Sequence, residues 1–303
     1  MKNLVFLFSL IVSLEAFDYH LVPQKLSKDT YCFFGKLENI SKENAGNIVN
    51  TCYVQTKEGF VVIDSGPTYA YAQQAYAQMQ KIADIPVKYV ITTHDHDDHW
   101  LGNSFYKHKD VFFIGPKTYE ENVYAGMHTR MENALGKELV NTQKIVKLDQ
   151  VVEKKYTFTL GDKIFEVLQP VSQAHTKGDL IVYLEKDRIV FTGDLVFNDR
   201  LSSLRDGSLL GSLAALEVID KLDAKIIVGG HGYKTDANAT VEFSNYLKEM
   251  KNGILKAIED DVTIDEIAKT LPMSDYKAKK LYDILHKRNV FDAYRELEFF
   301  GGE

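Results

Sequence analysis

Thr93-His94-Asp95-His96-Asp97-Asp98-His99-Trp100 is the stretch of sequence that decides the fold of this chain. Three imidazoles and a carboxylate, those of His94, His96, Asp98 and His99, stand within six residues of one another. Nitrogen and carboxylate-oxygen donors of this kind suit zinc, with iron or manganese as alternative occupants. The segment therefore predicts a transition-metal site.

The residues on either side of this segment indicate how its side chains converge. An apolar run over residues 87–92 is typical of a β-strand that ends just before the first histidine. His94 and His96 are two residues apart on extended backbone, so their side chains are expected to point the same way. Asp98 and His99 then lie where a helix expected over residues 100–106 begins, which turns them toward the same point from another side.

Three more donors follow far downstream: His175, Asp194 and His231. Each is expected on a loop that follows an apolar strand, and glycines precede Asp194 and His231, where they let the backbone turn sharply. A single histidine is more often a satisfied polar group than a ligand. Three donors in the same context at strand ends are harder to dismiss, and together with the first four they would suffice for two metal ions.

The rest of the chain before residue 238 alternates short apolar segments with polar turns. A helix is expected over residues 69–83. The expected strands cover residues 30–35, 48–56, 60–64, 111–115, 145–149, 156–160, 163–169, 180–185 and 188–192, with a hairpin turn at Gly161-Asp162.

Residues 117–142 have the size and the mixed aromatic and basic content of a lid over a site. A lid here would bring His128 and Arg130 over the metals, and these two residues are the candidate substrate contacts. The alternative is that residues 117–142 form a loop packed on the protein surface, with His128 and Arg130 exposed to solvent.

The tail from residue 238 onward changes character. Apolar residues over positions 243–258 recur at three- and four-residue intervals, which is the period of an amphipathic helix. Two more helices are expected over residues 263–271 and 274–289, the second with Ser274 as its N-cap. We expect these helices to pack on the preceding domain.

The composition excludes some partners. The chain has 303 residues, of which 45% are apolar and 12% aromatic, so it can bury a sizeable core. Its formal charge of −7 offers no basic surface to a polyanion. Nucleic acid is therefore not expected as a partner, and nuclease activity is disfavoured.

The first residues are typical of a secretory signal peptide: Lys2 supplies a positive charge, residues 4–14 form an apolar run, and Ala16 stands at the expected cut. We therefore expect removal of residues 1–16, a periplasmic mature chain, and membrane contact only through this segment. The alternative is an uncleaved anchor, although a span needs about 20 apolar residues.

The two cysteines agree with export. Cys32 and Cys52 each lie on a β-like segment, and these segments would pair as neighbours if the chain turns back through Gly46. In an oxidising compartment they could form a disulfide, and two buried free thiols fit the sequence equally well. Neither cysteine lies in a histidine cluster, so neither is assigned to metal.

The spacing His94-X-His96-X-Asp98-His99, followed by His175, Asp194 and His231, resembles the metallo-β-lactamase superfamily. The resemblance implies a four-layer αββα sandwich over residues 17–237, with the helices of residues 238–303 packed on it. It further implies that His94, His96 and His175 bind one metal, that Asp98, His99 and His231 bind a second, and that Asp194 bridges the two. Asp64 resembles the structural aspartate of the family.

A second resemblance covers nearly the whole mature chain. Residues 46–50, 206–211, 286–290 and 296–298 are similar to segments of the exported zinc metallohydrolases associated with quinoprotein-relay or sulfur-oxidation gene sets. These segments carry no self-evident chemistry. The resemblance favours an exported enzyme that holds two zinc ions per chain, with iron or manganese as alternatives.

The expected chemistry is hydrolysis by a metal-bridging hydroxide, with Asp98 or Asp194 as proton shuttle. If Asp98 instead orients a histidine, the site would hold one metal. β-Lactamases usually carry Cys or Ser where this chain has Asp194, which favours ester, thioester or lactone substrates over β-lactams. Two further alternatives are an iron-dependent sulfur dioxygenase-like enzyme and a non-catalytic metal-binding accessory protein of a periplasmic dehydrogenase system.

Overall fold

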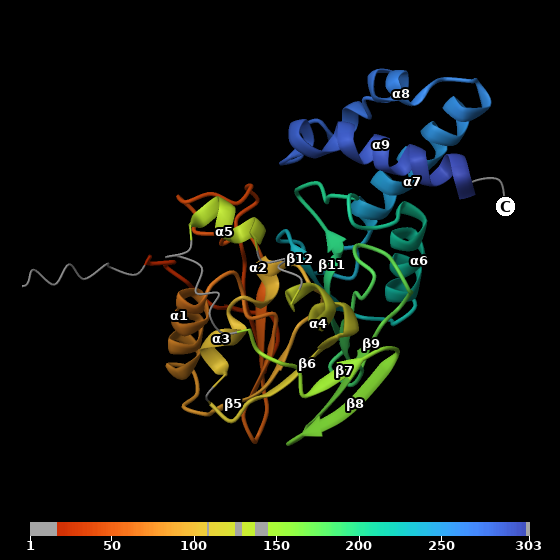
Figure 1. The fold of residues 1–303 in the computed structure, drawn as a ribbon. Coiled ribbons are helices and arrows are strands. Elements are labelled where there is room, and N and C mark those ends of the chain that lie inside the picture. The colour runs from red at the N-terminus through yellow and green to blue at the C-terminus, as the bar shows by residue number, and fades with distance from the viewer. Residues whose placement is uncertain (1–16, 108, 125–128, 137–144, 301–303) are drawn as a thin grey trace, which may run out of the picture.

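Short apolar strands pair into two sheets that pack face to face (Figure 1). The computed structural model describes residues 17–107, 109–124, 129–136 and 145–300, so the predicted signal peptide lies outside the described residues. Within them, one sheet has seven strands in the order β1 to β7, and the other has five in the order β12-β11-β10-β9-β8. The strands of the first sheet are β1 (Gln24–Lys25), β2 (Thr30–Phe33), β3 (Thr51–Gln55), β4 (Phe60–Ile63), β5 (Val87–Ile91), β6 (Phe112–Pro116) and β7 (Gln150–Val152). Those of the second are β8 (Lys155–Leu160), β9 (Lys163–Leu168), β10 (Ile181–Leu184), β11 (Ile189–Phe197) and β12 (Ile226–His231).

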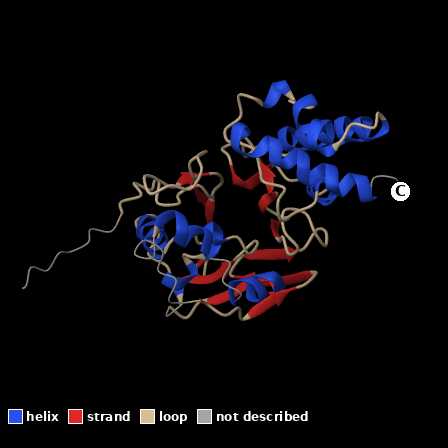
Figure 2. Ribbon diagram, turned by 45° about the horizontal axis from the view of Figure 1, so that its top comes forward, coloured by secondary structure: helices blue, strands red, loops and turns tan. Residues whose placement is uncertain are grey.

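Helices cover the outer face of each sheet (Figures 1 and 2). The first sheet is covered by α1 (Tyr69–Gln80), α2 (Asp97–Trp100), α3 (Asn103–Tyr106), α4 (Lys117–Tyr124) and α5 (Thr129–Leu135). The second is covered by α6 (Leu209–Asp220) and α7 (Val241–Glu259). Beyond the edge of this sheet, α8 (Ile264–Thr270), the 3₁₀ turn η1 (Ser274–Tyr276) and α9 (Tyr282–Phe300) pack together with α7 (Figure 1). The predicted αββα sandwich with a helical extension is confirmed.

The central strands, such as β3, β4, β10 and β11, are largely apolar because both of their faces are buried, whereas β8 at the edge alternates buried and exposed residues. Alternate residues of β3 pack on opposite sides: Val54 faces the core between the sheets, whereas Tyr53 packs under the helices. In β11, Phe191 faces the same inter-sheet core, and Val190 packs under the second helical layer. Each sheet therefore joins two layers of core.

Parallel pairing brings the ends of several strands to one edge. β4, β5, β6 and β7 are parallel neighbours in the first sheet, and β11 and β12 are parallel in the second. Parallel strands end at the same edge of their own sheet, and these edges of the two sheets face each other, since His99 lies close to His231 of β12 and Asp194 of β11.

Three predicted elements differ from the structure. Residues 145–148 form no strand, and pairing with β6 begins only at Gln150. Just before that residue, the carboxylate of Asp149 accepts a hydrogen bond from the backbone N–H of Phe113. The last helix begins at Tyr282 instead of Ser274, because Leu281 has a φ of +64° and Lys280 pairs through its backbone with the chain at Arg200. The helix expected over 100–106 is likewise two short helices, and the first begins at Asp97.

The C-terminal helices share a hydrophobic core with the second sheet. Leu247 and Met250 of α7 and Val290 of α9 lie in the same buried cluster as Val190 and Ile227 of the sheet. No helix in the described ranges is both long and apolar enough to cross a membrane.

Cys32 and Cys52 stand directly opposite each other in the antiparallel pair β2–β3, with their Cα atoms 4.1 Å apart, and form a disulfide. The two side chains are buried between the sheets. The sequence left open whether these two cysteines form a disulfide or remain free thiols. In the structure they form the disulfide.

We expect loss of this disulfide to lower the free energy of unfolding by about 3 kcal/mol, because the cross-link closes a chain loop of 20 residues in the unfolded state. Urea unfolding of the wild type with and without reductant measures the effect. The double variant Cys32→Ala/Cys52→Ala is the control, since reductant should leave its midpoint unchanged. A wild-type midpoint that does not respond to reductant would contradict the expectation.

Candidate metal centre

The seven predicted ligands meet at the edge where the two sheets face each other. His94 and His96 lie on the bend after β5, and the next two donors along the chain lie in α2. His175 comes from the loop between β9 and β10. Asp194 and His231 come from β11 and β12 of the second sheet.

The prediction that Asp194 and His231 lie on loops after their strands is wrong. Asp194 is inside β11, and His231 is the last residue of β12. The strand continues past Gly193 with an irregular register, and Gly193 has a φ of +50° there. A side chain at Gly230 would lie 2.0 Å from Asp194 Oδ1, so the bare backbone of this glycine makes room for the carboxylate.

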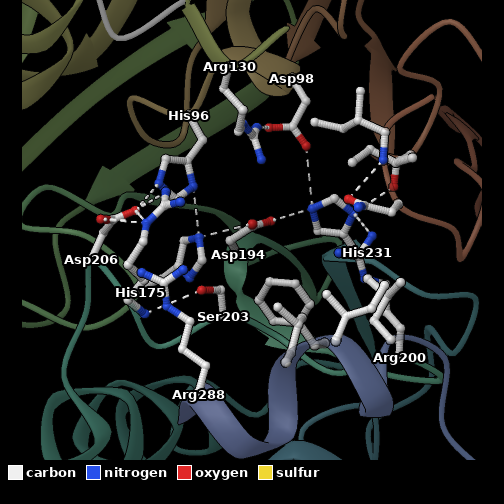
Figure 3. A pocket seen from close by; sticks show the side chains of 18 of the residues that line it. His96, Asp98, Arg130, His175, Asp194, Arg200, Ser203, Asp206, His231 and Arg288 are labelled. Atoms are coloured by element: carbon white, nitrogen blue, oxygen red, sulfur yellow. Dashed lines mark hydrogen bonds and ion pairs between the residues drawn. The ribbon is translucent and has the colours of Figure 1, made fainter. Parts of the chain in front are cut away.

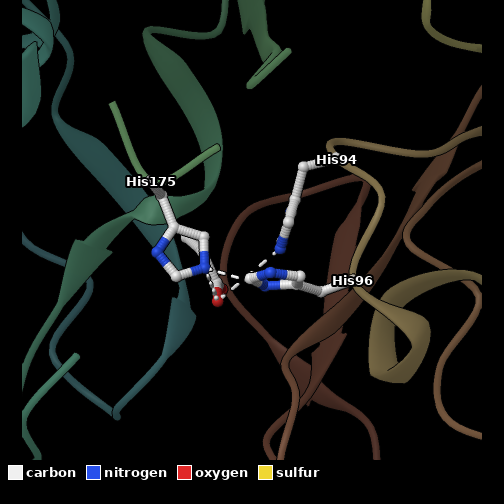
Figure 4. Close-up of side chains that lie close together, drawn as sticks. His94, His96 and His175 are labelled. Carbon is white, nitrogen blue, oxygen red and sulfur yellow. Dashed lines mark hydrogen bonds and ion pairs between the residues drawn. The ribbon is translucent and has the colours of Figure 1, made fainter. Parts of the chain in front are cut away.

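The first group of donors combines three imidazoles with Asp194. The rings of His94, His96 and His175 converge in Figure 4. His175 Nε2 lies 2.9 Å from His96 Nδ1 and 3.1 Å from Asp194 Oδ2, and His94 Nε2 lies 3.7 Å from the same oxygen. The donors of this group lie within 4.8 Å of one another, close enough to share one metal ion.

The second group comprises Asp98, His99 and His231. Asp98 Oδ2 lies 3.8 Å from His99 Nε2 and 3.6 Å from His231 Nε2. The other oxygen of the shared carboxylate, Asp194 Oδ1, lies 3.1 Å from His99 Nε2 and 3.3 Å from His231 Nε2. Asp194 therefore offers one oxygen to each group, which is the arrangement of a bridging ligand.

The donor set fits a divalent metal. Within the described residues, His94 Nε2, His99 Nε2 and Asp194 Oδ1 are buried without a hydrogen-bond partner. Buried polar atoms are rarely left unpaired, because their loss of water is then uncompensated. A cation held between them would satisfy all three, and imidazole with carboxylate is a donor set typical of zinc.

Hydrogen bonds behind the ligands fix which ring nitrogen faces the centre. His99 Nδ1 lies 2.8 Å from Asp64 Oδ2, and the same carboxylate accepts the backbone N–H and the hydroxyl of Thr93. His231 Nδ1 lies 2.5 Å from the carbonyl oxygen of Ile48. Each Nδ1 donates its hydrogen outward and leaves Nε2 free to bind a metal.

Asn50 holds the loop around His231 in place. Its Nδ2 donates to the carbonyl oxygens of Gly229 at 2.9 Å and Gly232 at 2.8 Å, and its Oδ1 accepts the N–H of Gly35. The sequence marked residues 46–50 only through a resemblance and gave no reason for them. The structure supplies one, since this segment supports a ligand from the other sheet.

Arg130 lies against the ligand Asp98. Its guanidinium donates to Asp97 Oδ1 at 2.6 and 2.9 Å and to Asp98 Oδ1. Burial alone would raise the pKa of Asp98, but the charge of Arg130 and the neighbouring imidazoles hold that pKa below its usual value. A substrate contact by Arg130, which also lines the cavity described below, stays a prediction, and His128 lies outside the described residues.

The pKa values of His94 and Asp194 suit metal binding, whereas at His99 and His175 the lowering by burial is outweighed by the charge of Asp194, which raises the pKa of both rings. Burial, followed by the charge of His99, lowers the pKa of His94 well below its usual value, so this ring is neutral. Burial would raise the pKa of Asp194, but the imidazoles of His231 and His99 hold it well below its usual value. The centre therefore presents a neutral imidazole and an ionised bridging carboxylate.

Asp206 is a neighbour of the centre that the sequence did not predict. Its Oδ2 lies 3.3 Å from His96 Nε2, on the side of the ring away from His175, and Arg205 pairs with the same carboxylate. The loop that carries Asp206 is held by α9: Glu296 accepts the hydroxyl of Ser208 and the backbone N–H of the following residue. No local pattern in the sequence joins residue 206 to residue 96.

A cavity of about 360 Å³ opens over the donors (Figure 3). Its floor includes His96, Asp98, His175, Asp194 and His231. The remaining wall comes from the chain near residues 39–48, from α5, from the loop after β11 and from the start of α9. The C-terminal helices thus form part of the site.

Comparison with known proteins agrees with this geometry. The family model described as the metallo-beta-lactamase superfamily matches residues 45–231. Hydroxyacylglutathione hydrolases from Brucella anthropi and Brucella ovis are each 31% identical over 153 residues, which is 50% of this chain and 49% and 50% of theirs. The chain therefore spans about half the length of the curated relatives it matches.

A solved structure shares the fold. The metallo-beta-lactamase from Pontibacter korlensis superposes with a TM-score of 0.62 and 22% sequence identity, and the match covers 75% of this chain and 99% of that one. The family model and the names of the curated relatives together support the prediction of a metal-dependent hydrolase.

Asp194→Ala should reduce zinc from about two ions to about one per chain, because it removes an oxygen from both groups of donors. Turnover should fall with it, by on the order of 100-fold. Elemental analysis of zinc-loaded protein measures the stoichiometry. Asp223→Ala, at a carboxylate whose side chain is 86% exposed, is the matched control. An unchanged stoichiometry in Asp194→Ala would rule out the bridging role.

Asp64→Asn should weaken zinc binding about 10- to 100-fold, because an amide of the same size lacks the charge and one of the two acceptor oxygens that orient His99 and bind Thr93. Competition with a chelator of known zinc affinity measures the change. Asp223→Asn should bind zinc like the wild type, and equal affinities in the two variants would contradict a positioning role for Asp64.

Proposed function

The chain belongs to the metallo-β-lactamase superfamily, and from that membership and its metal-binding geometry we propose that it is an exported dinuclear zinc hydrolase of ester, thioester or lactone bonds. The observation that carries the proposal is Asp194, which offers one carboxylate oxygen to each of two histidine groups. A second metal would have its own donors in Asp98, His99 and His231. The curated relatives are named hydroxyacylglutathione hydrolases, which are thioester hydrolases. Their names favour an acyl substrate.

The donors account for the chemistry proposed. Two divalent cations bound by them would supply a water of lowered pKa and polarise the carbonyl of a substrate. The chain itself contributes two carboxylates at the cavity floor, Asp98 and Asp194. The carboxylate of Asp98 lies at the cavity floor, where it could pass a proton to a leaving group.

Export is supported by one feature of the sequence and one feature of the structure. The first residues have the charge and the apolar run of a signal peptide. The disulfide Cys32–Cys52 is of a kind that forms and persists in oxidising compartments such as the periplasm.

We expect zinc-loaded protein to hydrolyse thioesters or lactones with a kcat/KM on the order of 100-fold above the β-lactam nitrocefin, because a bridging aspartate stands where β-lactamases usually carry Cys or Ser. Removal of metal with a chelator should abolish the activity, and added zinc should restore it. Initial rates on a panel of esters, thioesters, lactones and β-lactams show how kcat/KM ranks among these substrates.

Three outcomes would overturn the proposal. Comparable rates on nitrocefin and thioesters would favour a β-lactamase. Iron in natively purified protein, together with oxygen consumption on a persulfide, would favour a dioxygenase. No rate above that of metal-free protein on any substrate would favour a metal-binding accessory role.

A further inference from the structure

The turn between β12 and α7 carries a sequence pattern that the metal centre does not use. Residues 236–240 read Asp-Ala-Asn-Ala-Thr. Asn-X-Ser/Thr, with any residue but proline at X, is the acceptor pattern for N-linked glycans in exported proteins. Bacterial acceptor sites also have an acidic residue two positions before the asparagine, and Asp236 stands there. The same residues would suit the start of a helix, because asparagine is a common N-cap.

The structure distinguishes between these two uses of Asn238. α7 begins at Val241, and its N-cap is Thr240 instead of Asn238. The side chain of Asn238 is exposed, and its carboxamide makes no hydrogen bond to another residue in the described part of the chain. Asn238 therefore does not cap the helix, and its amide nitrogen is accessible from solvent.

Asp236 is held beside the asparagine. Its Oδ1 accepts the backbone N–H of Asn238 at 2.7 Å, which places both residues in one tight turn. The side chain of Asp236 is 61% exposed, and the ammonium of Lys234 approaches it only at 4.0 Å. The carboxylate is thus available to a cationic group of a modifying enzyme.

The threonine of the pattern is buried, in contrast to the asparagine. Thr240 is 2% exposed, and its hydroxyl donates to Asp220 Oδ1 at 2.7 Å. Ala239 is buried as well. An enzyme that recognises the threonine hydroxyl cannot reach it in the folded protein, so recognition requires the chain before α7 has packed.

The turn lies far from the metal donors. After His231 the chain runs back along β12, where the backbone of Asp236 pairs with Ile226. Ile226 and His231 are the first and last residues of β12, and five steps of strand separate them by about 16 Å. A glycan on Asn238 would therefore leave the opening of the cavity free.

We propose that Asn238 is an N-glycosylation site that is modified during export, before α7 packs on the second sheet. The donor is an oligosaccharide linked to a polyprenyl diphosphate, and the catalyst is an oligosaccharyltransferase. Asn238 Nδ2 forms a bond to C1 of the first sugar while the bond from C1 to the diphosphate oxygen breaks. The diphosphate leaves with the electron pair, and one amide hydrogen leaves as a proton. This inference rests on the export proposed above and is independent of the hydrolase activity.

Mass spectrometry of the full chain, isolated from the periplasm of its source cells, tests the site. Trypsin should release residues 235–248 as one peptide, because Lys234 and Lys248 precede its two cleavage points. We expect this peptide to carry a glycan mass on Asn238. A peptide of unmodified mass in all chains would overturn the proposal.

A second pattern in the chain supplies a matched control. Asn39-Ile40-Ser41 also fits Asn-X-Ser/Thr and its asparagine is exposed, but Leu37 stands where the acidic residue would be. In the periplasm of a strain that supplies a bacterial oligosaccharyltransferase and its lipid-linked donor, Asn238→Gln should lose the glycan and Asn39→Gln should keep it. A glycan that persists in Asn238→Gln would contradict the assignment.

Substitutions of Asp236 test recognition separately from the fold of the turn. Asp236→Asn keeps the oxygen that accepts the N–H of Asn238 but loses the charge, so most of the glycan should be lost. Asp236→Glu keeps the charge and should keep the glycan. Equal glycan occupancy in Asp236→Asn and the wild type would remove Asp236 from the acceptor site.

The order of modification and folding is tested in vitro. Folded, unmodified protein should gain no glycan from the transferase and its donor, whereas the same protein diluted from urea into that mixture should be modified on Asn238. Equal modification of both samples would overturn attachment before folding. Zinc-loaded Asn238→Gln should match the wild type in turnover, since the turn is at the other end of β12 from His231.

Failure of export and failure of the glycosylation site are distinguishable. A chain that stays in the cytoplasm would overturn export. The same chain behind a heterologous secretory leader, in the strain with the transferase, then decides whether Asn238 accepts a glycan.

Discussion

A single buried carboxylate organises this protein. Asp194 is 5% exposed and stands between two groups of imidazoles, each of which faces one of its oxygens. A buried charge of this kind is stable only when opposite charge surrounds it, and here that charge belongs to the histidines and to the metals they would hold. The irregular strand at Gly193 and the absent side chain at Gly230 both serve to seat it.

Much of the fold and the centre could be predicted from the sequence because their causes are local. Apolar runs predicted most of the strands, and the close spacing of His94, His96, Asp98 and His99 predicted that these residues are metal ligands. The positions of Asp194 and His231 inside their strands could not be predicted, because a strand irregularity depends on the neighbouring strand. The late start of α9 was missed for the same reason, since it follows from backbone pairing between Lys280 and Arg200.

Residues that support the donors were the hardest to foresee. Asp206 and Asn50 act on ligands that are distant in the chain, and neither stands in a pattern that distinguishes it from an ordinary loop residue. Arg130 was expected over the site as a substrate contact, which stays a prediction, and the pairing of its guanidinium with Asp97 and Asp98 was not foreseen. Long-range hydrogen bonds of this kind become visible only when the two sheets are brought together.

The hydrogen bonds between α9 and the loop after β11 have a consequence for the order in which the parts of the site form. Asn289 binds the backbone of Ser202 and Leu204, and Glu296 caps the start of α6 through Ser208. Part of the cavity wall therefore comes from residues 281–288, which follow all seven donors in the chain. A nascent chain would have all seven metal donors long before it had a place for a substrate, so capture of metal can precede completion of the pocket in time.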